Sequence, residues 1–136
     1  MNLTAAIHAR LVGDVTLTAL LSEYLGEPAV FTSDPAPGNA VLPYLVSAGQ
    51  VTDRAFDTKN SRGRQVWRDV RCYAPASGSA ALVETIAERV RVLLHRYAME
   101  VDGHETWVSE ASGPTGADEK DAYGRIVSLR LMLVEV

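Results

Sequence analysis

The stretch from about Ala80 to Tyr97 constrains the fold most, because it predicts an amphipathic helix that must cover something else. Its apolar side chains recur at helical spacing and fall within an arc of about 140°. They are Leu82, Val83, Ile86, Ala87, Val90, Leu93, Leu94 and Tyr97. A helix with one apolar face has to bury that face against a sheet or another helix. Ser77 or Ser79, after a turn at Pro75–Gly78, is expected to cap its N-terminus.

Several segments show the two-residue alternation of β-strands. Val30–Phe31 is a short candidate, and a strand opening with Pro43 follows the proline-rich loop 33–39. In Val66–Ala74 the side chains of Val66, Val70, Cys72 and Ala74 share one face. The last segment, Tyr123–Val136, is apolar on both faces towards its end, so it is expected inside the sheet.

The polar segment 51–65 lies between two of these predicted strands. We expect it to form the far end of a long hairpin whose stems are residues 42–50 and 66–74. A second hairpin is predicted from 99–101 to 105–109, because Asp102-Gly103 is a favoured turn pair. The acidic and glycine-rich stretch 112–121 is predicted as a loop.

Two helices are expected before the first strand. Asn2 can cap a helix with Leu3, Ile7 and Leu11 on one face, and a second helix is predicted near residues 16–24. The order of elements therefore predicts one α+β domain over residues 1–136, with helices packed on a small sheet.

Composition narrows the class of protein. The 136-residue chain is 47% hydrophobic and 22% charged, as expected of one folded domain, and its net charge of -4 argues against a dedicated nucleic-acid binder. A single cysteine, Cys72, excludes an intramolecular disulfide. No apolar run approaches the roughly 20 residues of a membrane span. Residues 1–10 lack the order of a signal peptide, so synthesis in a cytoplasm is expected.

No catalytic, metal or cofactor site is predicted. His8, His95 and His104 lack metal-ligand spacing, and Cys72 is expected to be a small core residue. The glycines at 113 and 116 do not have phosphate-loop spacing. Asp118, Glu119 and Asp121 could bind a hard cation, although a solvated loop is the simpler interpretation.

Charge is segregated along the chain, which is compatible equally with self-assembly and with two ordinary solvated loops. Residues 51–71 hold six basic and three acidic side chains, whereas residues 98–124 hold seven acidic side chains and Lys120. A basic arm and an acidic patch on one chain suit head-to-tail contacts, which close into rings when the rotation permits. Val92 lies on the polar side of the predicted long helix, between arginines. The candidate subunit-interface residues are Arg54, Lys59, Arg62, Arg64, Val92, Arg89 and Arg96, and the candidate acidic rim is Asp118, Glu119 and Asp121.

Over nearly its whole length the chain resembles the small tail-completion or tail-terminator proteins of long-tailed phages and gene transfer agents. The matching segments are "DVTLTALL", "AVF", "LPYLV", "VWRDVRCYA", "ALVETIAERVRVLLHRY" and "YGRIVSLRLMLVEV". The resemblance implies a small, mostly antiparallel sheet with helices on one face and an extended hairpin arm. It also implies a structural protein without catalytic residues.

The same resemblance implies a role at the head-proximal end of a tail tube. Such proteins form six-membered rings that stop tube growth and join the head connector, while DNA passes through the lumen. The expected partners are further copies of the chain, the tube protein and the connector protein, in a particle assembled in a bacterial cytoplasm. Two alternatives remain open: a head–tail connector adaptor or head completion protein, and a small enzyme or ligand-binding protein outside any particle.

Overall fold

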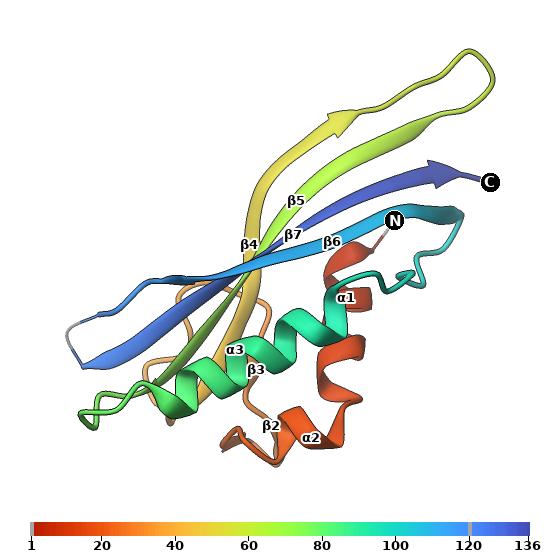
Figure 1. Ribbon diagram of the computed structural model, residues 1–136. Coiled ribbons are helices and arrows are strands. Elements are labelled where there is room, and N and C mark those ends of the chain that lie inside the picture. Colours follow the sequence, from red (N-terminus) through yellow and green to blue (C-terminus); the bar gives the residue numbers. More distant parts are fainter. Residues whose placement is uncertain (1, 120) are drawn as a thin grey trace.

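The computed structural model describes residues 2–119 and 121–136, without the side chains of residues 49–51. Its elements follow the order α1 (Leu3–Val12), α2 (Val15–Thr18), β1 (Glu23–Tyr24), β2 (Glu27–Pro28), β3 (Val30–Phe31), β4 (Tyr44–Ala55), β5 (Gly63–Pro75), α3 (Ala81–Leu94), β6 (His104–Gly116) and β7 (Ala122–Glu135). The predicted α+β class is confirmed (Figure 1). Lys120, the one cation of the predicted acidic stretch, lies outside the described residues.

Five strands form one sheet in the order β3-β4-β5-β7-β6. Only β3 runs parallel to its neighbour, and the other pairs are antiparallel. The C-terminal strand β7 therefore lies between β5 and β6, as its two apolar faces predicted. β1 and β2 form a separate two-stranded ribbon.

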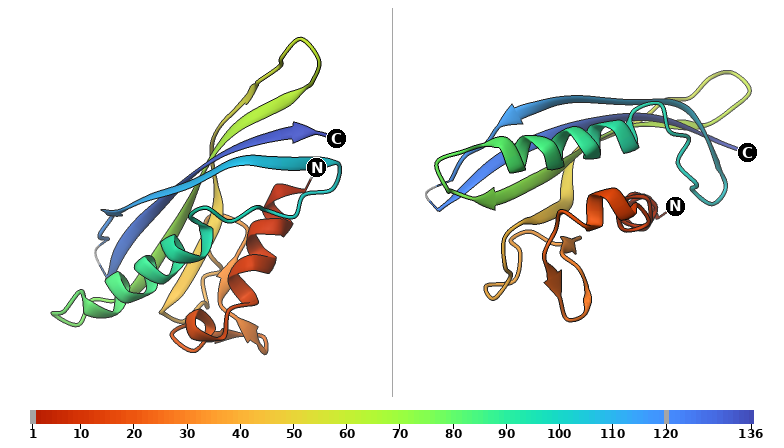
Figure 2. Two further views of the ribbon diagram at one scale, coloured as in Figure 1. Left: turned by 45° about the vertical axis from the view of Figure 1, so that its right-hand side comes forward. Right: turned by 60° about the horizontal axis from the view of Figure 1, so that its bottom comes forward.

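All three helices lie on one face of the sheet (Figure 2). The alternate residues Val127, Leu129, Leu131 and Leu133 of β7 are fully buried beneath them. α3 contributes Val83, Ile86, Ala87, Val90, Leu93 and Leu94 to the same core, and α1 contributes Leu3, Ile7 and Leu11. The predicted face of α3 is therefore largely confirmed. Leu82 is the exception, because it lies at the edge of the arc and remains 39% exposed.

A second, smaller cluster covers the opposite face at the end of the sheet away from the arm. Val46, Tyr73 and Ala122 are buried there, and Ala36 and Leu42 of the preceding loop pack on them. Next to this cluster Tyr24, Phe31, Tyr44 and Tyr73 form a row of ring contacts with centroids 5.2–5.6 Å apart. The loop predicted at 33–39 thus holds part of the helix-free face away from water.

The β4–β5 hairpin ends in a tip that projects from the sheet, and the arm is defined here as residues 53–64 (Figure 1). Within it, Gly63 and Arg64 of β5 also pair with Val134 and Leu133 of β7. The strand register shifts between Val46 and Gly49 and again between Gln50 and Thr52. Such bulges bend a strand, and β4 curves where the arm leaves the rest of the sheet. The predicted hairpin is confirmed: about half of segment 51–65 is strand, and residues 56–62 form the tip.

Several local predictions were wrong. The helix predicted at 16–24 ends at Thr18, and its last residues, Glu23 and Tyr24, pair instead with Glu27 and Pro28 across a turn with positive φ angles at Leu25 and Gly26. Ala80 is the N-cap of α3 and makes no side-chain cap bond, while Ser79 Oγ accepts a hydrogen bond from the Ala81 N–H. α3 ends at Leu94, before Tyr97.

The second predicted hairpin was also misplaced. Residues 99–101 form no strand, and Asp102-Gly103 is the turn that leads into β6. β6 continues to Gly116 through most of the predicted loop, so the true hairpin joins β6 to β7. Pairing with the apolar strand β7 determines this structure, since strand formation depends more on neighbours than on local composition.

Candidate assembly surfaces

The side chains of Cys72, His95 and His104, which could support catalysis, are buried or held by hydrogen bonds within the chain. Burial raises the pKa of the Cys72 thiol from 9.0 to about 12. His95 Nδ1 accepts a hydrogen bond from the Ala111 N–H, and His104 Nδ1 lies 3.0 Å from the Asp102 carbonyl oxygen. Among residues 2–119 and 121–136, no group of three His, Cys, Asp or Glu side chains could hold a metal ion.

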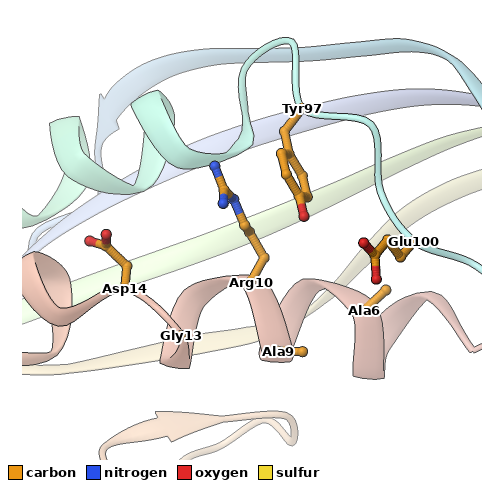
Figure 3. Close-up of a pocket in the computed structure, with 7 residues that line it drawn as sticks. All are labelled: Ala6, Ala9, Arg10, Gly13, Asp14, Tyr97 and Glu100. Atoms are coloured by element: carbon orange, nitrogen blue, oxygen red, sulfur yellow. The ribbon is translucent and has the colours of Figure 1, made fainter.

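A cleft between α1 and the segment after α3 is lined by Arg10, Asp14 and Glu100, of which Arg10 and Asp14 already have partners (Figure 3). Arg10 donates from Nε to the Leu93 carbonyl oxygen, and its guanidinium lies 3.7 Å from the centre of the Tyr97 ring. These contacts satisfy the C-terminal end of α3, where carbonyl groups lack helical partners. The cleft therefore joins the helices rather than presenting a set of convergent polar groups to a ligand.

Asp14 lies at the other end of this cleft and connects α2 to α3 (Figure 3). It caps α2 by accepting the Leu17 N–H and also accepts two hydrogen bonds from Arg89, at 2.8 and 2.9 Å. The Arg89 hydrogen bonds are the main cause that lowers the pKa of Asp14 from 3.8 to about 2. Arg89, predicted as an interface residue, thus has a structural partner within the same chain.

The arm brings the predicted basic residues together. Arg54, Lys59 and Arg62 lie on β4 and the tip, whereas Arg64 pairs with Asp53 across the two strands, with Nε 3.0 Å from Oδ1. Gly63 is buried where the tip rejoins β5, and a Cβ there would lie 2.7 Å from the Phe56 carbonyl oxygen. Only glycine fits this close crossing without a shift of the backbone.

The remaining candidate residues lie on separate surfaces. Val92 is 50% exposed on α3, in an open groove that also includes Leu20 and Ala81. Arg96 follows α3 with a positive φ angle, and its N–H donates to the Ser109 carbonyl oxygen. The structure therefore brings Val92 and Arg89 together in one groove on α3, whereas Arg96 lines a different groove beside β6.

The acidic stretch divides into two groups at opposite ends of the sheet. Asp118, Glu119 and Asp121 lie at the β6–β7 turn, where Asp118 accepts hydrogen bonds from the Gly124 N–H and Arg125. Exposed Glu100, Asp102 and Glu105 lie at the other end, at and before the start of β6. The sequence presented these acids as one patch, because the strand that separates them was predicted as a loop.

Trp107 is the surface residue that the sequence reasoning missed. It lies on edge strand β6 and is 54% exposed. The two-residue alternation of β6 is broken here by a register shift between Thr106 and Val108. In the sequence, a tryptophan inside a predicted hairpin was the available sign of this surface. It could be recognised only with the knowledge that β6 is an edge strand.

These features define a class: a small α+β chain with a projecting hairpin arm and charged surfaces at both ends of its sheet. A family model described as "Tail completion protein gp17" matches residues 5–134, so the chain belongs to this family. It is a structural protein of a phage-type tail, and its place is the virion tail.

Comparison with solved structures supports the same fold. A chain described as "Virion of native gene transfer agent (GTA) particle" superposes with a TM-score of 0.79 at 16% sequence identity, covering 97% of this chain and 94% of that one. At this identity the likeness concerns the fold. Comparison with curated proteins finds no match. In the described residues, no helix is long and apolar enough to cross a membrane.

Proposed function

We propose that this chain is a tail terminator. Copies of it form a ring, with six members as the expected number, at the head-proximal end of the tail tube. The ring stops tube polymerisation and joins the tail to the head connector, and DNA passes through its lumen without sequence-specific binding. The chain acts as a structural component rather than as an enzyme, with other copies, tube protein and connector protein as its partners.

The observation that carries this proposal is the arm of a tail-completion protein projecting beyond its helix-covered core. Most residues of this arm are exposed, and the helices α1 and α3 pack on the inner face of the sheet elsewhere. Its exposed cations and the acids at the start of β6 lie on opposite edges of the sheet. Different surfaces on opposite edges suit a heterologous contact, which is the kind that closes into a ring.

The acidic group at the β6–β7 turn has a separate role in this proposal. Asp118, Glu119 and Asp121 lie at the end of the sheet away from the arm. If this end rims the channel, its negative charge repels passing DNA and keeps the phosphate backbone from binding. Replacing Glu119 and Asp121 with lysine is then expected to slow DNA ejection while leaving ring assembly intact.

The test is deletion of the gene in the producing strain, followed by electron microscopy of the released particles. Overlong or ragged tails without heads are the expected result, and wild-type protein supplied in trans should restore normal length. Normal-length tails beside leaking, unjoined heads would instead indicate a head–tail connector adaptor. Unchanged particles would contradict both roles and leave a function outside the particle.

A further inference from the structure

The start of β6 forms an edge surface whose central side chain is Trp107. The indole lines a groove together with the segment Arg96–Ala98, which runs alongside the strand. The bulge between Thr106 and Val108 interrupts the regular ladder at this position. Bulges at sheet edges re-aim side chains and disfavour pairing with a further strand. The edge is therefore built for side-chain contact rather than for extension of the sheet.

The next part of the same edge is already occupied by the chain itself. Arg96 donates its N–H to the Ser109 carbonyl oxygen, and the Ala111 N–H donates to His95 Nδ1. Ser109 Oγ also donates to the Leu94 carbonyl oxygen at 2.8 Å. These bonds fix the segment after α3 against β6, so the groove around Trp107 is preformed in the monomer.

The exposed side chains at and before the start of β6 are predominantly acidic, whereas the charged residues that line the groove itself are Arg96 and Glu110. Glu100, Asp102 and Glu105 are exposed, and Glu110 further along β6 pairs with Arg130 at 3.2 Å. Arg96 is the basic residue that lines the groove. An exposed indole on a strand that begins with exposed acids is suited to a cationic side chain, because the ring face attracts cations and the acids supply the opposite charge.

The arm carries exposed cationic side chains, and it lies at the same end of the sheet as the start of β6. The C-terminal residues connect the two surfaces: Glu135 donates its N–H to the Arg62 carbonyl oxygen, and Val136 donates to the Gly103 carbonyl oxygen. The arm tip and the start of β6 are therefore at the same end of the sheet, on opposite sides of β7 (Figure 1). Because these two surfaces lie on opposite sides of β7, a side-by-side rotation of copies can bring the arm of one copy to the β6 edge of the next.

We propose that the arm of a second copy docks on the Trp107 edge, with Arg54, Lys59 or Arg62 over the indole and opposite the acids around Glu105. This inference rests on the proposed ring and names the contact that closes it. Tryptophan and arginine are enriched among the few residues that carry most of an interface's binding energy. Trp107 is thus the anchor of the contact, and the arm cations determine its partner.

Cross-linking between two singly substituted proteins tests the placement. Lys59→Cys is mixed with Glu105→Cys under assembly conditions and treated with a short bismaleimide, and Cys72 does not interfere because it is buried. Asp121→Cys is the matched control, since it replaces an exposed acid at the far end of the sheet. We expect Lys59→Cys to form cross-linked dimers with Glu105→Cys and to form few with Asp121→Cys. Equal yields, or cross-linking of residue 105 only to added tube protein, would overturn the inference.

Assembly of purified variants tests the energetics. Trp107→Ala is expected to raise the concentration needed for ring formation at least tenfold by sedimentation velocity, with the melting temperature of the monomer nearly unchanged because the side chain is exposed. Lys59→Glu with Arg62→Glu should weaken assembly similarly, and adding Glu105→Arg to these changes should partly restore it. If the wild-type protein forms rings and Trp107→Ala forms them at the same concentration, the docking inference is wrong but the proposed function is not affected. A wild-type chain that stays monomeric at every concentration, together with unchanged particles after gene deletion, would overturn the proposed function as well.

Discussion

The arm and the rest of the sheet share strands β4 and β5, yet they are stabilised in different ways. Near Tyr44 and Tyr73 the sheet is covered by helices on one face and by an aromatic row and a loop on the other. In the arm, residues 53–64, the two strands have an ion pair across them, and the backbone bond from the Phe56 N–H to the Gly63 carbonyl oxygen closes the tip. The covered part stabilises the monomer, and the arm remains available to a partner.

This difference separates stability from assembly in one continuous hairpin. Burial of apolar area is the main favourable term in folding, so most of the free energy of folding comes from the covered part of the sheet. Exposed ion pairs contribute little. Substitutions in the two regions are therefore expected to change different measurements, and the following predictions test that separation.

The largest expected contrast is in thiol reactivity. Cys72 lies under the helices with a pKa of about 12, while a Lys59→Cys variant has a second thiol at the exposed tip. Since the thiolate is the reactive form, Cys72 should react about a thousandfold more slowly than the tip thiol near pH 8. Labelling rates read by mass spectrometry check this, with urea-unfolded protein as the control in which both thiols react quickly. Similar rates in the folded protein would mean that the covered region opens easily.

The next contrast is in global stability. Leu129→Ala removes a fully buried side chain of β7 and should lower the free energy of unfolding by about 3 kcal/mol. Arg54→Ala in the arm should change it by less than about 0.5 kcal/mol. Urea unfolding followed by circular dichroism measures both. A loss of more than about 1 kcal/mol for Arg54→Ala would show that the arm takes part in the monomer's cooperative unit.

The covered region was also the more predictable of the two. Periodicity identified α1, most of α3, β3, β5 and the interior position of β7, because apolar spacing records burial directly. The Asn2 cap was confirmed by the hydrogen bond from the Ala5 N–H to its Oδ1. Where a segment buries one face against the core, its sequence contains the pattern that identifies it.

Edge segments lack that pattern and were predicted poorly. β6 contains Gly113 and Pro114, which normally punctuate loops, yet it forms a strand with a register shift between Ser112 and Thr115. Proline and glycine are tolerated at such edge bulges. The assembly surfaces lie on these same edges, so the sequence suggested the basic arm but joined the acidic residues of both sheet ends into one patch and missed Trp107.

A third prediction concerns the ion pair that joins the helices. Asp14→Asn keeps a residue that can cap α2 but loses the charge opposite Arg89, so stability at pH 7 should fall by about 1 kcal/mol after allowance for solvent screening. Folding depresses the pKa of Asp14 to about 2, so this stabilisation is present above about pH 4 and is lost as the pH falls towards 2. The difference between wild type and variant, measured by urea unfolding at pH 7, 4 and 2, should shrink over this range. A difference independent of pH would assign the effect to something other than the charge.

The smallest expected effect comes from the equivalent change in the arm. Asp53→Asn removes the carboxylate opposite Arg64, whose side chain is 44% exposed, against 33% for Arg89 in the helix layer. Because solvent screens the more exposed pair, the monomer should lose less than about 0.5 kcal/mol, and added salt should reduce even that. The variant also makes the arm more basic, so under the proposed docking it should assemble at a concentration no higher than wild type. If Asp53→Asn destabilises the monomer as much as Asp14→Asn does, the Arg64–Asp53 pair supports the fold. The separation between a stabilising core and an arm that is available to a partner would then be wrong.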